Sequence, residues 1–374
     1  MAQIRSLPPM CCRYLSRVSR FSRASRITLA KNSALFNFST NSRGESVKPP
    51  FSKDILTLDP EKELQKICSQ IRLLMRKQLK RRGLVVALSG GIDSSVSVGL
   101  ATKALGPERV VALLMPERHS SDDTLDLSKS VAETFRVKWF HEDISRVLEA
   151  VGFYRRYDDA VRKAIPEYGD GWKSKIVIPN VMESKGFNLF SVVAQQPDGT
   201  QVQKRLPLEA YLEIVAATNF KQRTRKMFEY YYADRFNYAV VGTPNRLEYD
   251  QGFFVKLGDG AADIKPIAHL YKTQVYQMAA HLGVPEKIRM RPPTTDTYSM
   301  PQGQDEFYFS LPHDKMDLCL YGKNNGYRPE EIAATLGLTF DQVQRVYDDI
   351  DTKRSTTRYL HLSPQLIEAV SEIK

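Results

Sequence analysis

Apolar positions follow two different rhythms along the chain after about residue 50. Over Glu61–Leu79 they recur at helical spacing, and Asp59-Pro60 stands before them as an N-terminal cap. Positive charge at Lys77–Arg82 suits a helix C-terminus, and Gly83 is expected to close this helix. The next five residues, Leu84–Leu88, are all apolar. Such a run is typical of a strand buried on both faces of a parallel sheet.

The same alternation continues downstream and predicts the fold class. Further helices are expected over Ile92–Leu105, Asp122–Phe135, Leu208–Arg235 and Thr273–Leu282. Further strands are expected over Val110–Met115, Val137–Phe140 and Tyr238–Val241. Strands that alternate with helices indicate an α/β fold, in which a doubly wound parallel sheet is flanked by helices.

Residues 166–207 interrupt this rhythm. Two strand-like pieces, Ile176–Ile178 and Leu189–Val193, flank a turn at Pro197–Thr200. We interpret the segment as an inserted hairpin-like element and not as a domain of its own. Residues 46–374 are therefore expected to form one domain with an insertion at about 166–207.

The first 48 residues differ from the rest in composition. They contain nine Lys or Arg, one acidic residue and nine Ser, whereas the remaining chain carries 45 basic and 42 acidic residues. The formal charge of +11 therefore belongs mostly to the N-terminus and says little about what the folded body binds. A basic, Ser-rich and acid-poor N-terminus is typical of an organellar presequence. We expect residues 1–45 to direct import into the mitochondrial matrix. The alternatives are a plastid presequence, or a disordered basic tail or RNA-binding arm on a cytoplasmic protein.

Two classes of protein are excluded by simple counts. Apolar runs such as Leu84–Leu88 are far too short to cross a bilayer, so no membrane partner is expected. The four cysteines stand at irregular spacing and give neither a disulfide framework nor a zinc signature. A reducing compartment fits this pattern best.

The sharpest local feature is the segment Ser89-Gly-Gly-Ile-Asp-Ser-Ser95, between a predicted strand and a predicted helix. Adjacent glycines allow a tight turn and close approach to an anion, and the helix N-terminus and the serines add hydrogen-bond donors. Asp93 beside phosphate calls for a bridging cation, for which Mg²⁺ is suited. The alternative is an ordinary strand–helix turn with a serine cap. The spacing excludes a Walker A loop and the Gly-X-Gly-X-X-Gly fingerprint.

The string Ser-Gly-Gly-X-Asp-Ser resembles the pyrophosphate loop of the N-type ATP pyrophosphatases. This superfamily has an adenine nucleotide alpha hydrolase-like, Rossmann-like fold, and the loop by itself does not choose among its members. Other segments are similar in order and spacing to ammonia-dependent NAD synthetase: Asn219–Arg225, Gly242–Glu248, Gly252–Gly260, Ala262–Pro266, Leu270–Thr273 and Pro293–Asp296. The resemblance runs from about residue 60 to residue 320.

The resemblance implies a ligase that forms a C–N bond. Deamido-NAD would be amidated with ammonia at the expense of ATP, through an acyl-adenylate, to give NAD, AMP and pyrophosphate. The resemblance also implies Mg²⁺ as cofactor and a homodimer. About 35 residues separate the presequence from the first strand, too few for a glutamine-hydrolysing domain. Free ammonia or a separate ammonia donor is therefore expected.

The resemblance also implies roles for individual residues. ATP is expected to contact Ser89, Gly90, Gly91, Ile92, Asp93, Ser94, Ser95, Thr243, Lys272 and Thr294. Deamido-NAD is expected to contact Arg223, Lys256, Asp259 and Asp263. Mg²⁺ would be held by Asp93 and Glu248, and the catalytic residues would be Asp93 and Lys272. Arg223 and Arg225 stand two apart on a helix, so at most one should face the site, and the family pattern selects Arg223.

Some segments depart from the family pattern. The 166–207 segment is longer than in a compact member, and Arg354–Arg358 stands where the family has a C-terminal His-Lys pair. A relative that amidates another carboxylate therefore stays an alternative. A tRNA-modifying ligase of the same superfamily is a second one, although the body has a net charge of only +3 and no interleaving of aromatic and basic residues. No nucleic-acid partner is expected.

Overall fold

The computed structural model describes residues 48–121, 123–177, 190–292, 297–303, 308–309 and 311–373. The proposed presequence and Thr294 thus lie outside the described residues. The chain divides into two units at Pro50, and everything below concerns the unit Phe51–Lys374.

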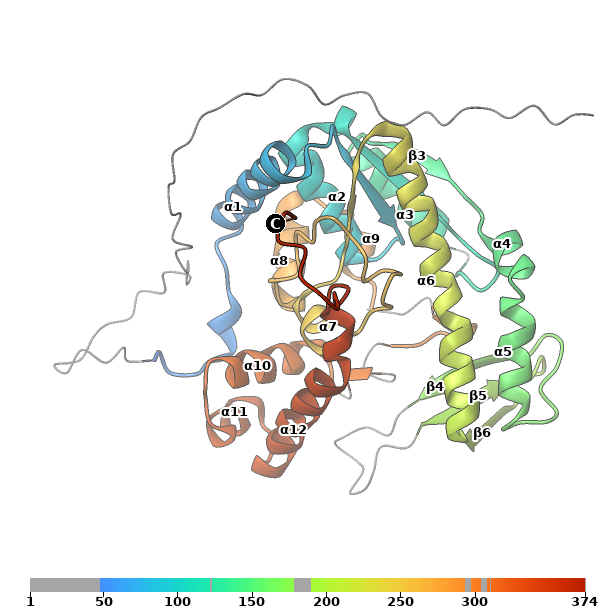
Figure 1. The fold of residues 1–374 in the computed structure, drawn as a ribbon. Coiled ribbons are helices and arrows are strands. Elements are labelled where there is room, and N and C mark those ends of the chain that lie inside the picture. The colour runs from blue at the N-terminus through green and yellow to red at the C-terminus, as the bar shows by residue number, and fades with distance from the viewer. Residues whose placement is uncertain are drawn as a thin grey trace, which may run out of the picture. The chain divides into compact units, whose positions relative to one another are not determined.

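A sheet of four parallel strands lies at the centre, in the order β3-β2-β1-β7 (Figure 1). The strands are β1 Leu84–Leu88, β2 Val110–Leu114, β3 Lys138–His141 and β7 Ala239–Val241. Leu84 of β1 is in register with Val110 of β2 and with Ala239 of β7. Since β1 has β2 on one side and β7 on the other, the order of the strands reverses at β1.

Successive side chains of β1 enter two separate cores. Leu84, Val86 and Leu88 are buried with residues of one group of helices: α1 Pro60–Leu74, α2 Ile92–Leu105, α3 Thr124–Thr134 and α8 Lys272–Leu282. Val85 is buried with residues of the second group: α4 Ser145–Ala150, α5 Phe153–Arg162 and α6 Leu208–Phe236. Helices therefore cover both faces of the sheet, and the predicted doubly wound α/β class is confirmed.

The insertion folds as a three-stranded antiparallel sheet in the order β4-β5-β6. Its strands are β4 Lys173–Val177, β5 Ser191–Gln195 and β6 Gln201–Arg205. The turn at Pro197–Thr200 joins β5 to β6. The predicted hairpin had only two strands, which correspond to β4 and β5, so the prediction missed β6. The missed strand is a polar edge strand with mostly exposed side chains, which gives no apolar signal. Val192 and Ala194 are buried together with α5 and α6, so the insert shares its core with the main sheet.

The C-terminal part adds a third core that the hydrophobic pattern did not identify. It is built from α10 His313–Asn324, α11 Pro329–Leu336 and α12 Phe340–Thr357, with Leu56 and Leu247 from elsewhere in the chain. Two shorter helices, α7 Arg246–Gln251 and α9 Glu286–Arg289, and the short helical turns complete the fold: Lys53–Leu56, Met75–Leu79, Pro107–Arg109 and Arg358–His361. No helix among the described residues is long and apolar enough to cross a membrane.

The end of the first helix differs from its prediction. α1 ends at Leu74 and continues as a π-helical turn over Met75–Leu79, after which Lys80 leaves the helix with a φ of 52°. Gly83 does not close the helix. Its role is close approach, because a Cβ there would lie 2.3 Å from the carbonyl oxygen of Arg109. The bounds of the other predicted helices and strands of the main sheet agree to within two residues.

Candidate active site

A cavity of about 1120 Å³ opens beside the carboxyl end of β1. In doubly wound sheets this is where ligands bind, outside the strand ends at the point where the strand order reverses. The cavity is lined by the loop after β1, by Thr243 after β7, and by Glu248 and Lys272 from two further helices. The fold therefore brings four separated segments of the sequence to one edge of the sheet.

Serine hydroxyls shape the loop between β1 and α2. Ser94 Oγ donates to the Gly91 carbonyl oxygen at 3.0 Å and lies 3.2 Å from Ser89 Oγ, and Ser95 Oγ donates to the same carbonyl at 2.8 Å. Gly90 has a φ of 70°, and a Cβ there would lie 2.9 Å from Leu127 Cβ, so glycine is required. Gly91 caps α2 and has no side chain to accept from the first N–H groups of the helix. These N–H groups and the partial positive charge of the helix end are suited to an anion.

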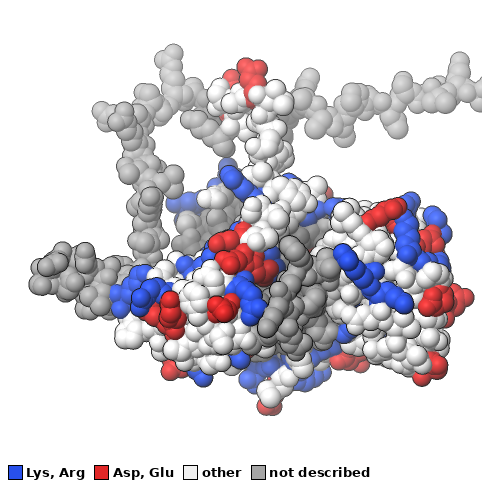
Figure 2. Space-filling model, turned by 90° about the horizontal axis from the view of Figure 1, so that it is seen from below, with Lys and Arg blue, Asp and Glu red and all other residues white. Residues whose placement is uncertain are grey.

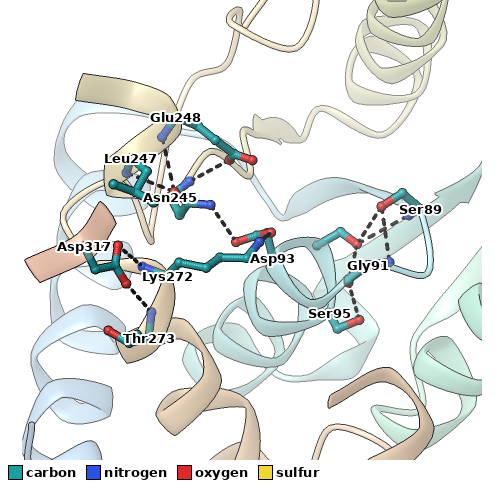
Figure 3. A network of polar contacts seen from close by, with 11 residues as sticks. Ser89, Gly91, Asp93, Ser95, Asn245, Leu247, Glu248, Lys272, Thr273 and Asp317 are labelled. Atoms are coloured by element: carbon teal, nitrogen blue, oxygen red, sulfur yellow. Dashed lines mark hydrogen bonds and ion pairs between the residues drawn. The ribbon is translucent and has the colours of Figure 1, made fainter. Parts of the chain in front are cut away.

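Lys272 and Asp93 form an ion pair at the floor of the site (Figure 3). The Lys272 side chain is 2% exposed and that of Asp93 is 17% exposed. The other Asp93 oxygen accepts from Asn245 Nδ2 at 3.1 Å. Asn245 also caps α7: its Oδ1 accepts from the Glu248 backbone N–H, while Glu248 Oε2 accepts from the Asn245 backbone N–H at 3.1 Å. One buried asparagine thus holds both carboxylates that were predicted to bind metal.

The charges of these groups depend on one another. Burial acts to lower the pKa of Lys272, but the negative charges of Asp93 and Glu248 outweigh it, so the pKa is raised and the ammonium stays charged. The start of α8 is fixed by Asp317 of α10, which accepts from the backbone N–H groups of Lys272 and Thr273 at 3.2 and 2.7 Å. Burial raises the pKa of Asp317 to about 7, although the Thr273 N–H opposes this shift.

Most of the residues predicted to bind ATP or metal line this one cavity. They are Ser89, Gly90, Gly91, Ile92, Asp93, Ser94, Thr243, Glu248 and Lys272. Ser95 is fully buried behind the loop, where its hydroxyl holds the Gly91 carbonyl and does not face the cavity. Ser95 is therefore not a lining residue of the cavity, and its ATP contact stays a prediction.

Of the four residues predicted to bind deamido-NAD, one lines the cavity and three do not. Asp259 lines the cavity, with Oδ1 accepting from the Val255 N–H at 2.8 Å. Arg223, Lys256 and Asp263 are not among the lining residues. Arg223 Nε donates to the Lys256 carbonyl, Lys256 Nζ donates to the Tyr359 carbonyl at 2.8 Å, and Asp263 accepts from the Val240 N–H at 2.7 Å. These contacts hold the 252–263 loop in place, and a substrate contact for the three residues stays a prediction.

Only one of the two neighbouring arginines of α6 faces the cavity, as the helical spacing requires. It is Arg225 and not Arg223, and its Nε donates to the Met115 carbonyl at the end of β2. The sequence also missed Asn245 and Asp317. Asn245 stands three residues before Glu248, which is the spacing of a capping box and a usable signal. Asp317 lies 44 residues from Thr273 and 45 from Lys272, and no local pattern marks it.

Comparison with known proteins places these features in a family. The sequence model of the NAD synthase family matches residues 63–166 and 172–358. The chain is 57% identical over 334 residues to the NH(3)-dependent NAD(+) synthetase of Rhizobium meliloti, and the match covers 89% of this chain and 100% of that protein.

Solved structures show the same fold at much lower identity. The NH3-dependent NAD synthetase of Campylobacter jejuni superimposes with a TM-score of 0.54 and 21% identity, and the NMN synthetase of Francisella tularensis with 0.53 and 22%. Each match covers 83% of this chain and all of the other. On the family match and the identity to the Rhizobium protein, this chain belongs to the NH3-dependent NAD+ synthetase family.

Proposed function

We infer that this chain is a ligase that amidates deamido-NAD with ammonia, converting ATP to AMP and pyrophosphate and releasing NAD. Its membership of the family and its identity to the full length of the Rhizobium meliloti synthetase support this function. In the structure, one observation carries this function: the loop Ser89–Ser94 and the Lys272–Asp93 ion pair line the same cavity.

The reaction needs alignment and charge stabilisation, with no protein nucleophile. The nicotinate carboxylate attacks the α-phosphorus of ATP and expels pyrophosphate, and ammonia then attacks the acyl carbon and expels AMP. In our proposal the N–H groups at the start of α2, with Ser89 and Ser94, bind phosphate oxygens. Lys272, kept charged by Asp93 and Glu248, neutralises charge that develops on the pyrophosphate. Thr243 also lines the cavity, and we assign Thr294 to the same substrate on the family resemblance alone.

The donor set also fits a magnesium ion. Asp93 and Glu248 come from different helices, both line the cavity, and both are held by Asn245. Mg²⁺ prefers one or two carboxylates together with phosphate oxygens and water. The described residues contain no group of three or more His, Cys, Asp or Glu that could enclose an ion, so the remaining ligands would come from ATP and water. When bound, the ion would supply positive charge to the leaving pyrophosphate.

A product assay tests the function directly. Purified full-length chain is supplied with ATP, MgCl₂ and NH₄Cl, and with deamido-NAD or with nicotinate mononucleotide in parallel. We expect NAD, AMP and pyrophosphate in equal amounts with deamido-NAD. Formation of ADP in place of AMP, or faster amidation of the mononucleotide, would contradict the proposal.

A matched pair of variants tests the site. Asp93→Asn removes the carboxylate at the second position of α2, and Asp341→Asn removes an exposed carboxylate at the second position of α12. We expect Asp93→Asn to lower the rate of AMP formation by about a hundredfold or more, because the charge partner of Lys272 is lost. Asp341→Asn should keep the native rate. Equal rates for the two variants would show that the site lies elsewhere.

The face shown in Figure 2 gives no support to a tRNA-modifying ligase. On the face shown in Figure 2, basic and acidic side chains of the described residues stand in small mixed groups, with uncharged surface between them. A nucleic-acid footprint would instead be a continuous basic patch or stripe.

We propose that residues 1–45 form an organellar presequence and that the mature enzyme works in the mitochondrial matrix. The basic, Ser-rich and acid-poor composition of this segment supports the proposal. A fluorescent fusion of residues 1–60 should enter mitochondria, and an otherwise identical fusion with Arg13, Arg17 and Arg20 changed to Ala should stay outside. Import of both fusions, or of neither, would count against it.

A homodimer is proposed from the family alone, and sedimentation equilibrium measures it.

A further inference from the structure

The cavity wall formed by α6 carries a buried ion pair that the reaction scheme above leaves unused. Lys226 Nζ lies 2.7 Å from Glu229 Oε2, and the side chains are only 6% and 4% exposed. Both residues line the main cavity, together with Arg225 of the same helix. The pair thus lies at the same cavity as the ATP loop, on a wall formed by a different element.

Stability does not account for this pair. Removing two charges from water costs several kcal/mol per ion, and apolar residues of similar volume in the same place are often as stabilising or more so. The positions are three apart on a helix, where two apolar side chains would pack against each other equally well. A buried pair kept at a cavity wall is therefore better explained by what enters the cavity.

The surroundings of the pair point to the second substrate. The 252–261 loop packs directly on α6, since a Cβ at Gly258 would lie 2.9 Å from Gln222 Cβ. Asp259 of this loop also lines the cavity, and burial raises its pKa while the Lys226 charge opposes that shift. Burial likewise raises the pKa of Glu229, again opposed by Lys226. Lys226 is thus held beside two buried acids, with its charge partly offset before any ligand arrives.

We propose that Lys226, positioned by Glu229, binds an anionic oxygen of the acyl substrate and determines its specificity. This inference rests on the proposed function. A buried ammonium recognises carboxylate and phosphate oxygens alike as a point charge, and deamido-NAD carries both. Glu229 keeps the ammonium in one position, so that less side-chain freedom is lost when the substrate binds.

The central test replaces both charges at once. Lys226→Met combined with Glu229→Leu removes both charges of the pair, whereas either single change would leave the other residue buried without its counter-ion. We expect the Michaelis constant for deamido-NAD to rise about tenfold or more, because a charge-assisted hydrogen bond is lost, while that for ATP stays within about twofold. The matched control is Glu63→Leu with Lys66→Met, which removes an ion pair of the same types and spacing on α1, away from the cavity.

Two further measurements make the result decisive. The single variant Lys226→Arg keeps a cation and should retain most of the native affinity for deamido-NAD. The single variant Lys226→Gln keeps a hydrogen-bond donor without charge and should lose that affinity. Native enzyme that turns over deamido-NAD, together with a folded double variant of unchanged Michaelis constant, would overturn this inference and leave the proposed function standing. Native enzyme without turnover would instead remove the proposed function.

Inhibition by the product NAD shows whether Lys226 binds a phosphate or the carboxylate of the substrate. NAD retains both phosphates of the dinucleotide and carries an amide in place of the carboxylate. If Lys226 binds phosphate, the inhibition constant of NAD should rise in the double variant as much as the Michaelis constant of deamido-NAD. If Lys226 binds the carboxylate, only the constant for deamido-NAD should rise.

Discussion

At the level of single residues, the geometry of the site depends on positions that tolerate neither an added side-chain atom nor a lost charge. Gly90 is such a position, because its left-handed φ and its distance from Leu127 both exclude a side chain. Lys272 is another, because a buried ammonium stays charged only beside Asp93 and Glu248. The geometry of the site therefore depends as much on small residues and fixed charges as on the polar groups that line the cavity.

Two glycine variants test this view of the loop. Gly90→Ala and Gly283→Ala both place a Cβ on backbone with positive φ, at 70° and 76°. At Gly283 no described atom lies within 4 Å of the added Cβ, whereas at Gly90 the Cβ meets Leu127 and the Thr124 carbonyl oxygen. We expect Gly283→Ala to cost about 1 kcal/mol of unfolding free energy and to keep the native Michaelis constant for ATP. Gly90→Ala should cost more and raise that constant.

Urea unfolding and initial rates at varied ATP measure both effects. Equal losses of stability in the two variants, with an unchanged Michaelis constant for ATP, would show that the loop tolerates a side chain and does not approach the phosphates closely.

At the scale of elements, the site is built from helix starts. α2 presents uncapped N–H groups to the cavity, and α7 is capped by Asn245. α8 begins at Lys272 and is capped by the Asp317 carboxylate, which comes from α10 of the third core. The position of Lys272 is therefore set by a helix more than forty residues further along the chain.

Asp317 gives this arrangement a pH dependence. Its pKa is about 7 in the folded chain and near 3.8 in a model compound, so between these values the folded chain holds a proton that the unfolded chain has released. The contribution of Asp317 to the unfolding free energy is therefore complete below about pH 4. It falls as the pH rises through 7, and is constant above that. Asp317→Asn should lack this slope.

We expect the variant to gain stability relative to the native chain as the pH rises from 5 to 8, by a few kcal/mol at most. Urea unfolding of both proteins across this range measures the difference. A difference that does not change with pH would show that Asp317 titrates in the folded chain as it does in water.

At the scale of the whole molecule, the insert is part of the enzyme's core. Ile176 of β4 and Val192 of β5 are fully buried in the cluster that also holds α5, α6 and alternate residues of β1 and β2. The long α6 runs past both the main sheet and the insert (Figure 1), and its buried residues share one cluster with both. It also supplies Arg225 and Lys226 to the cavity. The insert therefore supports one wall of the site.

A core substitution in the insert tests this coupling. Ile176→Ala should lower the unfolding free energy of the whole unit by about 2–5 kcal/mol, because the buried cluster is shared. Val202→Ala in the edge strand β6, where the side chain is partly exposed, should cost much less. Unfolding of Ile176→Ala should remain a single transition by both fluorescence and circular dichroism. A separate early transition would show that the insert folds on its own.

The local pattern of apolar and polar residues was enough to predict many of the helices and strands of this molecule. The strand Leu84–Leu88 and the helix Ile92–Leu105 were predicted with their bounds, because apolar runs and helical spacing are properties of neighbouring residues. The loop between them was predicted to bind phosphate from its own residues, and it lies at the sheet edge that such a site requires. Strand β6 was missed because its mostly exposed, polar side chains give no apolar signal. The C-terminal helices were missed because their core also draws on partners that are distant in sequence, such as Leu56 and Leu247.

The fold class, the glycine–serine loop and the family resemblance could all be read from the sequence, since each depends on short runs of adjacent residues. Only the tertiary structure decided that Arg225 and not Arg223 faces the cavity, that Asn245 holds both carboxylates, and that Asp317 fixes the start of α8. It also brought Lys226 and Glu229 to the wall of the site. The physical reason is the same in each case: facing and burial are set by packing between segments far apart in the chain, and no local pattern records them.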